Sequence, residues 1–425
     1  MRYKPNHSAN ETGRTRRFRL VNAALFALFA ILLCADTARA QGQPLYDAPE
    51  RIVVKSQVLG EERTVLVRTP AAYARGTERF PVLYMTDGDG HIQHTSGTVS
   101  FLARNARMPD MIVVGITNTD RTRDLSPTHV AQAPDNPNAR FPTSGGADKF
   151  IKFIETELIP LVESKYRTQP YRALAGHSLG GLFAIHTMLT RPELFNSYIA
   201  VSPALQWDNF VLIDRAKAFF KARKELNRTL FTSLGNEPGD IGDAFKLFRE
   251  VLQKQEATGF VWEAAQYEDE DHGSVVLRSH YAGLRKAFDG WQFPRDPNTG
   301  AVAGGLKGIE DHYGKLSARL GYTVLAPEAL MNQIGYQLLG QGQGDTEGAI
   351  AAFKLNVERY PGSANVYDSL GEAYERAGQL ELARTNYEKA HALGQQTNDP
   401  NVAIYKTNLD RVAAQAKQGG ADAKK

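Results

Sequence analysis

The chain reads Gly176-His177-Ser178-Leu179-Gly180 between a mostly apolar run, 171–175, and a helix-like stretch, 181–190. In a G-x-S-x-G pattern of this kind the serine lies on a sharp turn between a strand and a helix. The residues two places on either side must then lack side chains that would clash with the helix and the neighbouring strand. This context predicts that Ser178 is an exposed nucleophile. The alternative is that these Gly and Ser residues only form an ordinary loop.

Outside this stretch, short apolar runs alternate with helical segments. A hairpin is predicted over 51–70, because apolar and polar residues alternate there on both sides of Gly60. The other predicted strands are 80–85, 111–116, 197–201, 229–234 and 260–267, and the predicted helices include 148–166, 213–226 and 244–258. This order predicts an α/β fold with a mostly parallel sheet and helices on both faces. Such sheets bind ligands at the carboxyl ends of their strands, where 87–88, Ser178 and His272 fall.

A serine nucleophile needs a base within hydrogen-bonding reach. In α/β hydrolases the chain order is serine, acid, histidine, which leaves His272 and His280 as candidates before the sequence changes character. His272 follows the last predicted strand and is the predicted base. The alternative is that His272 is only a surface loop residue beside the acidic residues that precede it. His280 lies in a helix-like segment and is expected to pack.

The acid is expected in the turn-rich loop after 229–234. Glu237 is the first carboxylate there and is the predicted acid, and Asp240 and Asp243 are the alternatives. Each of the three could instead be a solvated loop residue, and Asp240 could cap the following helix.

An oxyanion hole needs two backbone N–H groups aimed at the developing charge. One is expected from Leu179 and the other from Gly88 or Asp89, in a loop after strand 80–85. An acidic, glycine-rich loop with His91 nearby could also bind a metal, but the calcium-loop and zinc-helix patterns are missing. No metal or cofactor is therefore expected.

The polar segment 118–142 is expected to form part of a substrate wall. Arg121 and Arg123 could clamp an anionic group, or Asp124 could pair with one of them. Trp207 could line the substrate pocket or belong to the core.

The first 40 residues resemble a secretory leader, with four arginines within 14–19, directly before the apolar run 21–33, and an Ala38-Arg39-Ala40 cleavage site. They hold seven of the 50 Lys and Arg and two of the 47 Asp and Glu, so the remaining chain carries a formal charge of about −2. This balance gives no support to nucleic-acid binding. Cys34 is the only cysteine, which excludes disulfides after cleavage. We expect a periplasmic or secreted protein without a membrane span.

A composition rich in Gly and polar residues follows Pro297, and helical segments come after it. Ala349 and Phe353 recur 34 residues later as Ala383 and Tyr387, the period of tetratricopeptide repeats. We expect a leader at 1–40, a hydrolase domain at 41–295, a linker at 296–325, tetratricopeptide-like repeats at 326–416 and a disordered tail at 417–425. Such repeats could dock a protein partner or mediate self-association.

Several segments together resemble one branch of the α/β hydrolases, the esterases that include esterase D and enterochelin-esterase-like proteins. They are Pro81-Val82-Leu83-Tyr84 with Asp87-Gly88, Gly115-Ile116 followed by R-x-R-D-L-S-P at 121–127, the GHSLGG elbow, and Ser202-Pro203 with Trp207. The resemblance implies ester hydrolysis, with Ser178 and His272 at the nucleophile and base positions.

We therefore expect an exported serine esterase that acts through an acyl-enzyme. An acyltransferase on the same fold and a repeat-mediated binding protein with a vestigial hydrolase domain are the alternatives. Siderophore lactones, aromatic esters and short acyl esters all remain open as substrates.

Overall fold

A computed structural model describes residues 48–422 except 75, 133–139, 301, 303 and 341–343, with side chains described up to 416. The predicted leader lies outside the described residues. Among those that are described, no helix is both long and apolar enough to cross a membrane.

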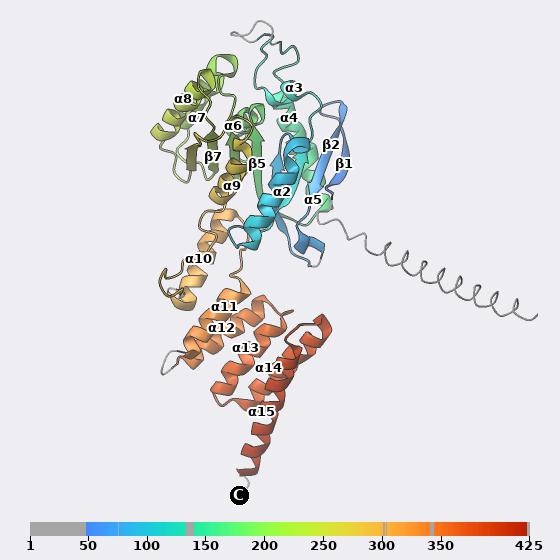
Figure 1. Ribbon diagram of the computed structural model, residues 1–425, viewed down its shortest axis with the longest axis vertical. Helices are drawn as coiled ribbons and strands as arrows, with labels where there is room; N and C mark the ends of the chain where they lie inside the picture. Colours follow the sequence, from blue (N-terminus) through green and yellow to red (C-terminus); the bar gives the residue numbers. More distant parts are fainter. Residues whose placement is uncertain are drawn as a thin grey trace, which may run out of the picture. The chain divides into compact units, whose positions relative to one another are not determined.

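One sheet of eight strands organises the first part of the chain (Figure 1). The strands are β1 (Glu50–Ser56), β2 (Glu61–Arg68), β3 (Phe80–Met85), β4 (Ile112–Ile116), β5 (Thr168–His177), β6 (Ser197–Val201), β7 (Thr229–Leu234) and β8 (Val261–Gln266). Their spatial order is β1-β2-β4-β3-β5-β6-β7-β8. The β1–β2 hairpin and the β2–β4 pair are antiparallel, and every later pair is parallel. The predicted hairpin and mostly parallel sheet are confirmed.

Helices cover both faces of this sheet, as the alternation of side chains along β3 and β6 shows. Val82 and Tyr84 belong to one buried cluster, whereas Leu83 and Met85 belong to another. The first cluster includes residues of α4 (Ala147–Phe153), α5 (Ile159–Lys165), α6 (Leu179–Thr190), α7 (Trp207–Ala222) and α8 (Asp240–Lys254). The second includes residues of α2 (Gly88–Arg104) and α9 (Val275–Ala287). Strand residues buried on both faces explain the continuous apolar runs in the sequence.

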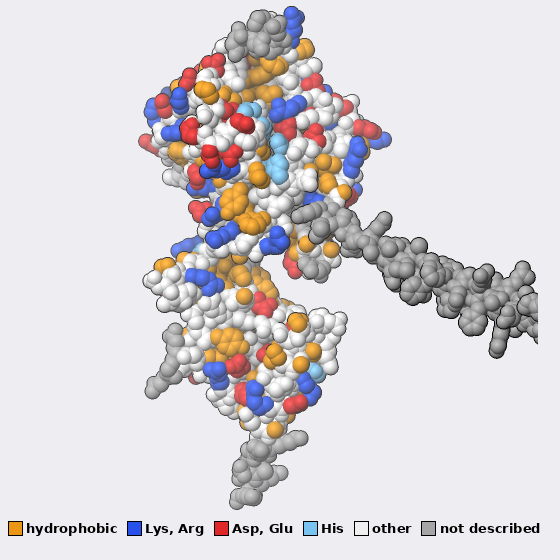
Figure 2. Space-filling view, viewed as in Figure 1, with side chains coloured by type: hydrophobic (Ala, Val, Ile, Leu, Met, Phe, Trp, Pro, Cys, Tyr) orange, Lys and Arg blue, Asp and Glu red, His pale blue; other side chains and the backbone are white. Residues whose placement is uncertain are grey.

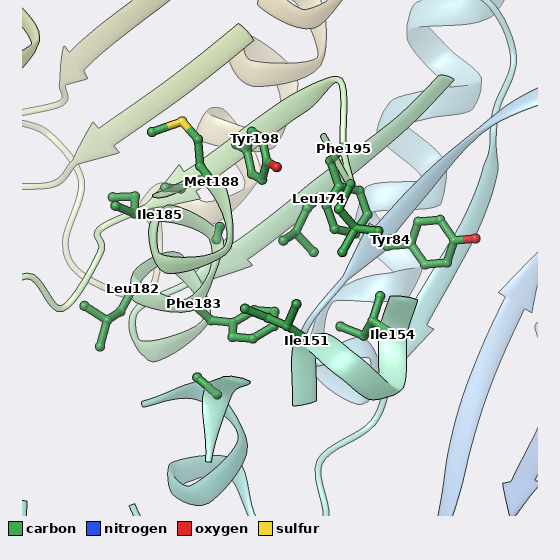
Figure 3. Packing of buried hydrophobic residues seen from close by; sticks show 14 of the residues in the cluster. Tyr84, Ile151, Ile154, Leu174, Leu182, Phe183, Ile185, Met188, Phe195 and Tyr198 are labelled. Carbon is green, nitrogen blue, oxygen red and sulfur yellow. The ribbon is translucent and has the colours of Figure 1, made fainter. Parts of the chain in front are cut away.

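Packing of its buried side chains holds α6, the helix that follows Ser178, in place. Phe183 points toward α4 and packs on Phe150, with ring centroids 5.3 Å apart, and Tyr84 meets Phe195 at 5.8 Å (Figure 3). The helix predicted at 148–166 is present as α4 and α5, joined by a π-helical turn, η2 (Ile154–Leu158). Burial of residues 180–188 explains why α6 is mostly apolar on every side.

Two segments differ from the sequence expectation. The glycine-rich stretch after β3, expected to be a loop, is the first turn of α2, whose Ile92, Val99 and Leu102 are buried in the second cluster. The stretch 296–325, expected to be a linker, contains α10 (Gly305–Leu320). Ile309 and Leu316 of α10 join the same cluster. In both cases tertiary burial outweighs a local sequence rich in glycine.

The C-terminal region is all helical, with α11 (Glu328–Gly340), α12 (Thr346–Arg359), α13 (Ala364–Arg376), α14 (Leu380–Thr397) and α15 (Val402–Asp422). Successive helices pack on one another. A Cβ on Gly335 would lie 2.4 Å from the Phe353 ring, and one on Gly371 would lie 2.8 Å from the Tyr387 ring. The same glycine-to-aromatic contact therefore recurs in two consecutive helix pairs. The backbone of α15 continues into the segment expected to be a tail, whose residues 423–425 lie outside the described ones.

Candidate active site

Ser178 occupies the sharp turn between β5 and α6. Its φ of 61° and ψ of −116° are a strained combination for a residue with a side chain, and its N–H donates to Val201 O at 2.9 Å. The flanking glycines are needed because of what surrounds them. A Cβ on Gly176 would lie 2.2 Å from Gly180 O, and one on Gly180 would lie 2.2 Å from Thr86 Oγ1. The sequence argument for small residues at these positions thus has a direct structural basis.

His272 lies on the loop between β8 and α9, and its Nδ1–H donates to Glu237 Oε2. The His272 side chain is 43% exposed, whereas that of Glu237 is 7% exposed. The pair also lies beside the elbow, because the ring centroids of His272 and His177 are 4.6 Å apart. A buried carboxylate on Nδ1 leaves Nε2 of the neutral ring free of its proton and able to accept one.

Glu237 is held by two further donors. Its Oε1 accepts from Ser202 Oγ at 2.6 Å and from Gly235 N at 3.1 Å. Burial raises the pKa of the Glu237 carboxyl, but the hydrogen bonds from His272, Ser202 and Gly235 outweigh it and leave the pKa below its usual value. The Glu237 carboxyl is therefore ionised near neutral pH.

The two alternative acids are placed differently. Asp243 is paired with Lys246 on the surface of α8 at 2.9 Å. Asp240 is the first residue of α8, and Gly239, with a φ of 83°, is the N-cap, so the cap lies one residue before the expected one. Of the three carboxylates considered from the sequence, Glu237 is the one in contact with His272.

The first turns of α2 and α6 approach each other near Ser178. A Cβ on Gly180 would come within 3.1 Å of Asp87 Oδ2, and Asp87 directly precedes α2 with a φ of 54°. The first N–H groups of a helix have no partner within it and carry a partial positive charge. Gly88 and Asp89 in α2 and Leu179 in α6 supply such groups, which is the chemistry expected of an oxyanion hole.

Both arginines considered as an anion clamp are paired with carboxylates. Arg121 Nε and Nη2 donate to the Asp87 carboxylate at 2.6 and 3.1 Å. Arg123 pairs with Glu61 at 2.6 Å and with Asp124 at 2.8 Å. The pairing with Asp124 that the sequence suggested as an alternative is thus present. A clamp role for either arginine stays a prediction.

Trp207 is a buried residue of the first cluster, 9% exposed. Its ring lies 5.1 Å from that of Phe141, and its Nε1–H donates to Thr128 Oγ1 at 3.2 Å. The next three residues, 208–210, all have positive φ, a left-handed turn that is rare without glycine. Trp207 joins this turn to the segment 118–142, and its role as a pocket wall stays a prediction.

A row of histidines continues from His272 and His177. His91 lies 5.8 Å from His177 and 5.2 Å from His94, and His94 stacks on His280 at 5.6 Å. Figure 2 shows histidine side chains gathered on one face of the sheet-bearing region. Within the described part of the chain, no group of three or more His, Cys, Asp or Glu side chains is arranged to hold a metal ion.

Two polar contacts of the site were not assigned a role from the sequence. His177, the variable residue of the elbow, donates through Nε2 to His272 O at 2.7 Å. Ser202, which has a φ of 39° and is fully buried, donates to Glu237. The sequence feature that could have indicated these roles is position: His177 directly precedes the nucleophile, and Ser202 directly follows β6.

Comparisons with known proteins fit this arrangement. The family model described as "Putative esterase" matches residues 56–272, just over half of the 425 residues. The ferri-bacillibactin esterase BesA of Bacillus subtilis is 29% identical over 216 residues, which are 46% of this chain and 75% of that protein. The siderophore enterobactin esterase of Emericella nidulans is 30% identical over 231 residues, 44% of this chain and 76% of that protein.

A solved structure extends the likeness to three dimensions. The IroE-like serine hydrolase from Shewanella oneidensis superposes with a TM-score of 0.61 at 29% identity and covers 73% of this chain and 99% of that one. The eight-stranded sheet, the strained serine elbow and the family match over residues 56–272 together show that the chain belongs to this family of esterases within the α/β hydrolases.

Proposed function

We propose that the protein is an exported serine esterase in which Ser178 is the nucleophile, His272 the general base and Glu237 the acid that orients the base. The observation that carries the proposal is the contact of the buried Glu237 carboxylate with His272, beside the strained Ser178 turn. His272 Nε2 takes the proton of Ser178 Oγ as that oxygen attacks the ester carbonyl. The imidazolium then gives the proton to the leaving alkoxide, and water repeats the sequence on the acyl-enzyme.

Stabilisation of the oxyanion is assigned to the N–H of Leu179 together with that of Gly88 or Asp89. The two helix N-termini bring partial positive charge to the same place from different strands of the sheet. Removing one such donor in a serine hydrolase costs on the order of 10² to 10³ in kcat.

The substrate class that we propose is the siderophore ester. This assignment is carried over from the relatives named as esterases of ferri-bacillibactin and enterobactin, which match the catalytic half of this chain. Transfer of the acyl group to an alcohol other than water would use the same residues, so the product must be identified directly.

Two measurements test the function. A fluorophosphonate probe should label the wild type and fail to label Ser178→Ala, because the probe reacts only with an activated serine. The wild type should also hydrolyse enterobactin or ferri-bacillibactin faster than p-nitrophenyl or feruloyl esters, with free acid as the product. Labelling that survives in Ser178→Ala would refute the nucleophile, and a preference for feruloyl esters would refute the substrate class.

We also propose that the leader at 1–40 directs export and that residues 326–416 form tetratricopeptide-like repeats that contact a protein partner or a second copy. The recurring contacts of Gly335 with Phe353 and of Gly371 with Tyr387 support a repeated helix pair. Size-exclusion chromatography with light scattering would distinguish self-association from a monomer.

A further inference from the structure

The variable residue of the elbow makes a contact that the family pattern does not require. His177 Nε2–H donates to the main-chain oxygen of His272 at 2.7 Å, and the two rings meet at 4.6 Å and 46°. His177 ends β5, and His272 follows β8, with β6 and β7 between these strands in the sheet. One side chain therefore joins the nucleophile turn to the loop of the base across two intervening strands.

His177 is itself fixed on its other side. Arg121 Nη2 donates to His177 O at 3.1 Å, and the same guanidinium is held by the Asp87 carboxylate. The main chain of the elbow at His177 is therefore anchored. A donor anchored in this way can restrict the loop to which it binds.

The loop of His272 needs such a restraint. The side chain of His272 is 43% exposed, so packing alone does not fix it. Glu237 holds Nδ1, but a ring held at a single atom can pivot about that hydrogen bond. Asp271 Oδ1 accepts from Gly273 N and Ser274 N, which orders the turn internally without fixing it to the elbow. Among the hydrogen bonds of the described residues, the one from His177 joins His272 itself directly to the nucleophile turn.

The ring of His177 can make this contact without adding a charge beside the base. Burial, together with the neighbouring His272 and His91, holds the pKa of His177 at about 4, although the hydrogen bond to His272 O and the Asp87 carboxylate act in the opposite direction. Burial likewise lowers the pKa values of His91, His94 and His280 behind it. A neutral neighbour does not oppose the imidazolium that forms on His272 during turnover.

We propose that His177 is a positioning residue that holds the His272 loop against the nucleophile turn through its hydrogen bond to the His272 carbonyl. The proposal rests on the proposed function, because it assumes that His272 is the base. It predicts that a side chain at 177 with an N–H donor keeps the base in place, whereas an apolar ring of similar size does not.

The experiment compares His177→Phe, which keeps the ring volume, with His177→Gln, which keeps an N–H donor. We expect His177→Phe to lower kcat on an activated ester at least tenfold with KM changed less than twofold, and His177→Gln to retain at least a third of wild-type kcat. His94→Phe is the matched control, since it makes the same exchange in the histidine row away from His272. Should His177→Phe fail to fold, His177→Ala takes its place.

A second readout does not depend on turnover. Hydrogen exchange of the segment 268–275 should accelerate in His177→Phe and stay at the wild-type rate in His177→Gln and His94→Phe. Wild-type kcat and exchange in His177→Phe would overturn the proposal, as would equal impairment of the Phe and Gln variants, which would mean that shape matters and donation does not. If the wild type hydrolyses no ester, the proposed function fails, while the exchange comparison still decides whether His177 restrains the loop.

Discussion

Replacing Glu237 by glutamine should invert the proton arrangement of His272 while leaving the fold in place. Gly235 N can only donate, and it donates to Glu237 Oε1 together with Ser202 Oγ. In Glu237→Gln the amide oxygen must therefore occupy the Oε1 position, which turns the NH₂ group toward His272 Nδ1. Two donors then face each other, so His272 must move its proton to Nε2, where it can no longer accept the proton of Ser178.

The expected loss follows from how strongly the site enforces that tautomer. In the best-studied serine protease, the corresponding acid-to-amide change lowers kcat about 10⁴-fold. His272 is 43% exposed, so water can compete for its ring and the ring can rotate, which recovers part of the activity. We expect a loss of about 10³-fold in kcat, equivalent to about 4 kcal/mol at roughly 1.36 kcal/mol per tenfold. The free energy of unfolding should change by about 1 kcal/mol or less, because the shape and both remaining hydrogen bonds are kept.

The assay is kcat on one activated ester at pH 8, with urea unfolding measured in parallel. Asp243→Asn is the matched control. It makes the same change six residues away in a surface pair with Lys246, and it should stay within twofold of the wild type. A kcat of Glu237→Gln within tenfold of the wild type would refute the tautomer argument and favour a Ser178–His272 dyad. A thousandfold loss in Asp243→Asn would transfer the role to that residue.

Three further predictions concern the folding of the site and of the helical region. Gly88→Ala should lower both activity and stability, because its Cβ would lie 2.4 Å from the backbone of β4. Gly90→Ala, in the same helical turn, meets nothing within 4 Å and should raise the free energy of unfolding by up to about 1 kcal/mol. Equal shifts of the urea midpoint in the two variants would contradict this. Folding lowers the pKa of His177 from 6.5 to about 4, so the folded state loses stability as the pH falls from about 6.5 toward 4. The contribution of His177 to the free energy of unfolding should fall by about 2 kcal/mol between pH 7.5 and 5, and this part of the loss should be missing in His177→Gln. Gly371→Ala places a Cβ 2.8 Å from the Tyr387 ring and should lower the Tm while the kcat per folded molecule stays unchanged, which calorimetry and active-site titration together can check.

The parts of this molecule that could be predicted from sequence are those determined within a short window. The elbow requires small residues two places on either side of Ser178, and the buried strands require continuous apolar runs, so the sequence predicts both. The first turn of α2 could not be predicted. Gly88 and Gly90 favour a turn locally, whereas the helix is stabilised by Ile92 and Leu102 in a cluster formed by distant segments.

The acid illustrates the same limit at finer scale. Glu237, Asp240 and Asp243 lie within seven residues of one another, and each has the chemistry required of a triad acid. Their different positions depend on how the β7 loop meets the β8 loop, where Asn236 N donates to Glu270 O at 2.7 Å. A Cβ on Gly235 would lie 2.8 Å from that same oxygen. The close approach of two loops that are over thirty residues apart in sequence turns Glu237 toward His272, and no local pattern encodes it.

The hydrogen bonds around the base connect the carboxyl ends of six strands, β3 to β8, including pairs such as β5 and β8 that do not neighbour one another. Asp87 holds Arg121, which donates to His177 O, and the His177 ring donates to His272 O. His272 in turn donates to Glu237, whose other oxygen accepts from Ser202 at the end of β6. Since each link fixes a different strand end, the position of His272 depends on contacts from at least three loops. A parallel sheet allows this arrangement because it brings all of those loops to one edge. The chemistry of the site therefore depends on residues that sequence periodicity can only classify as polar loop positions.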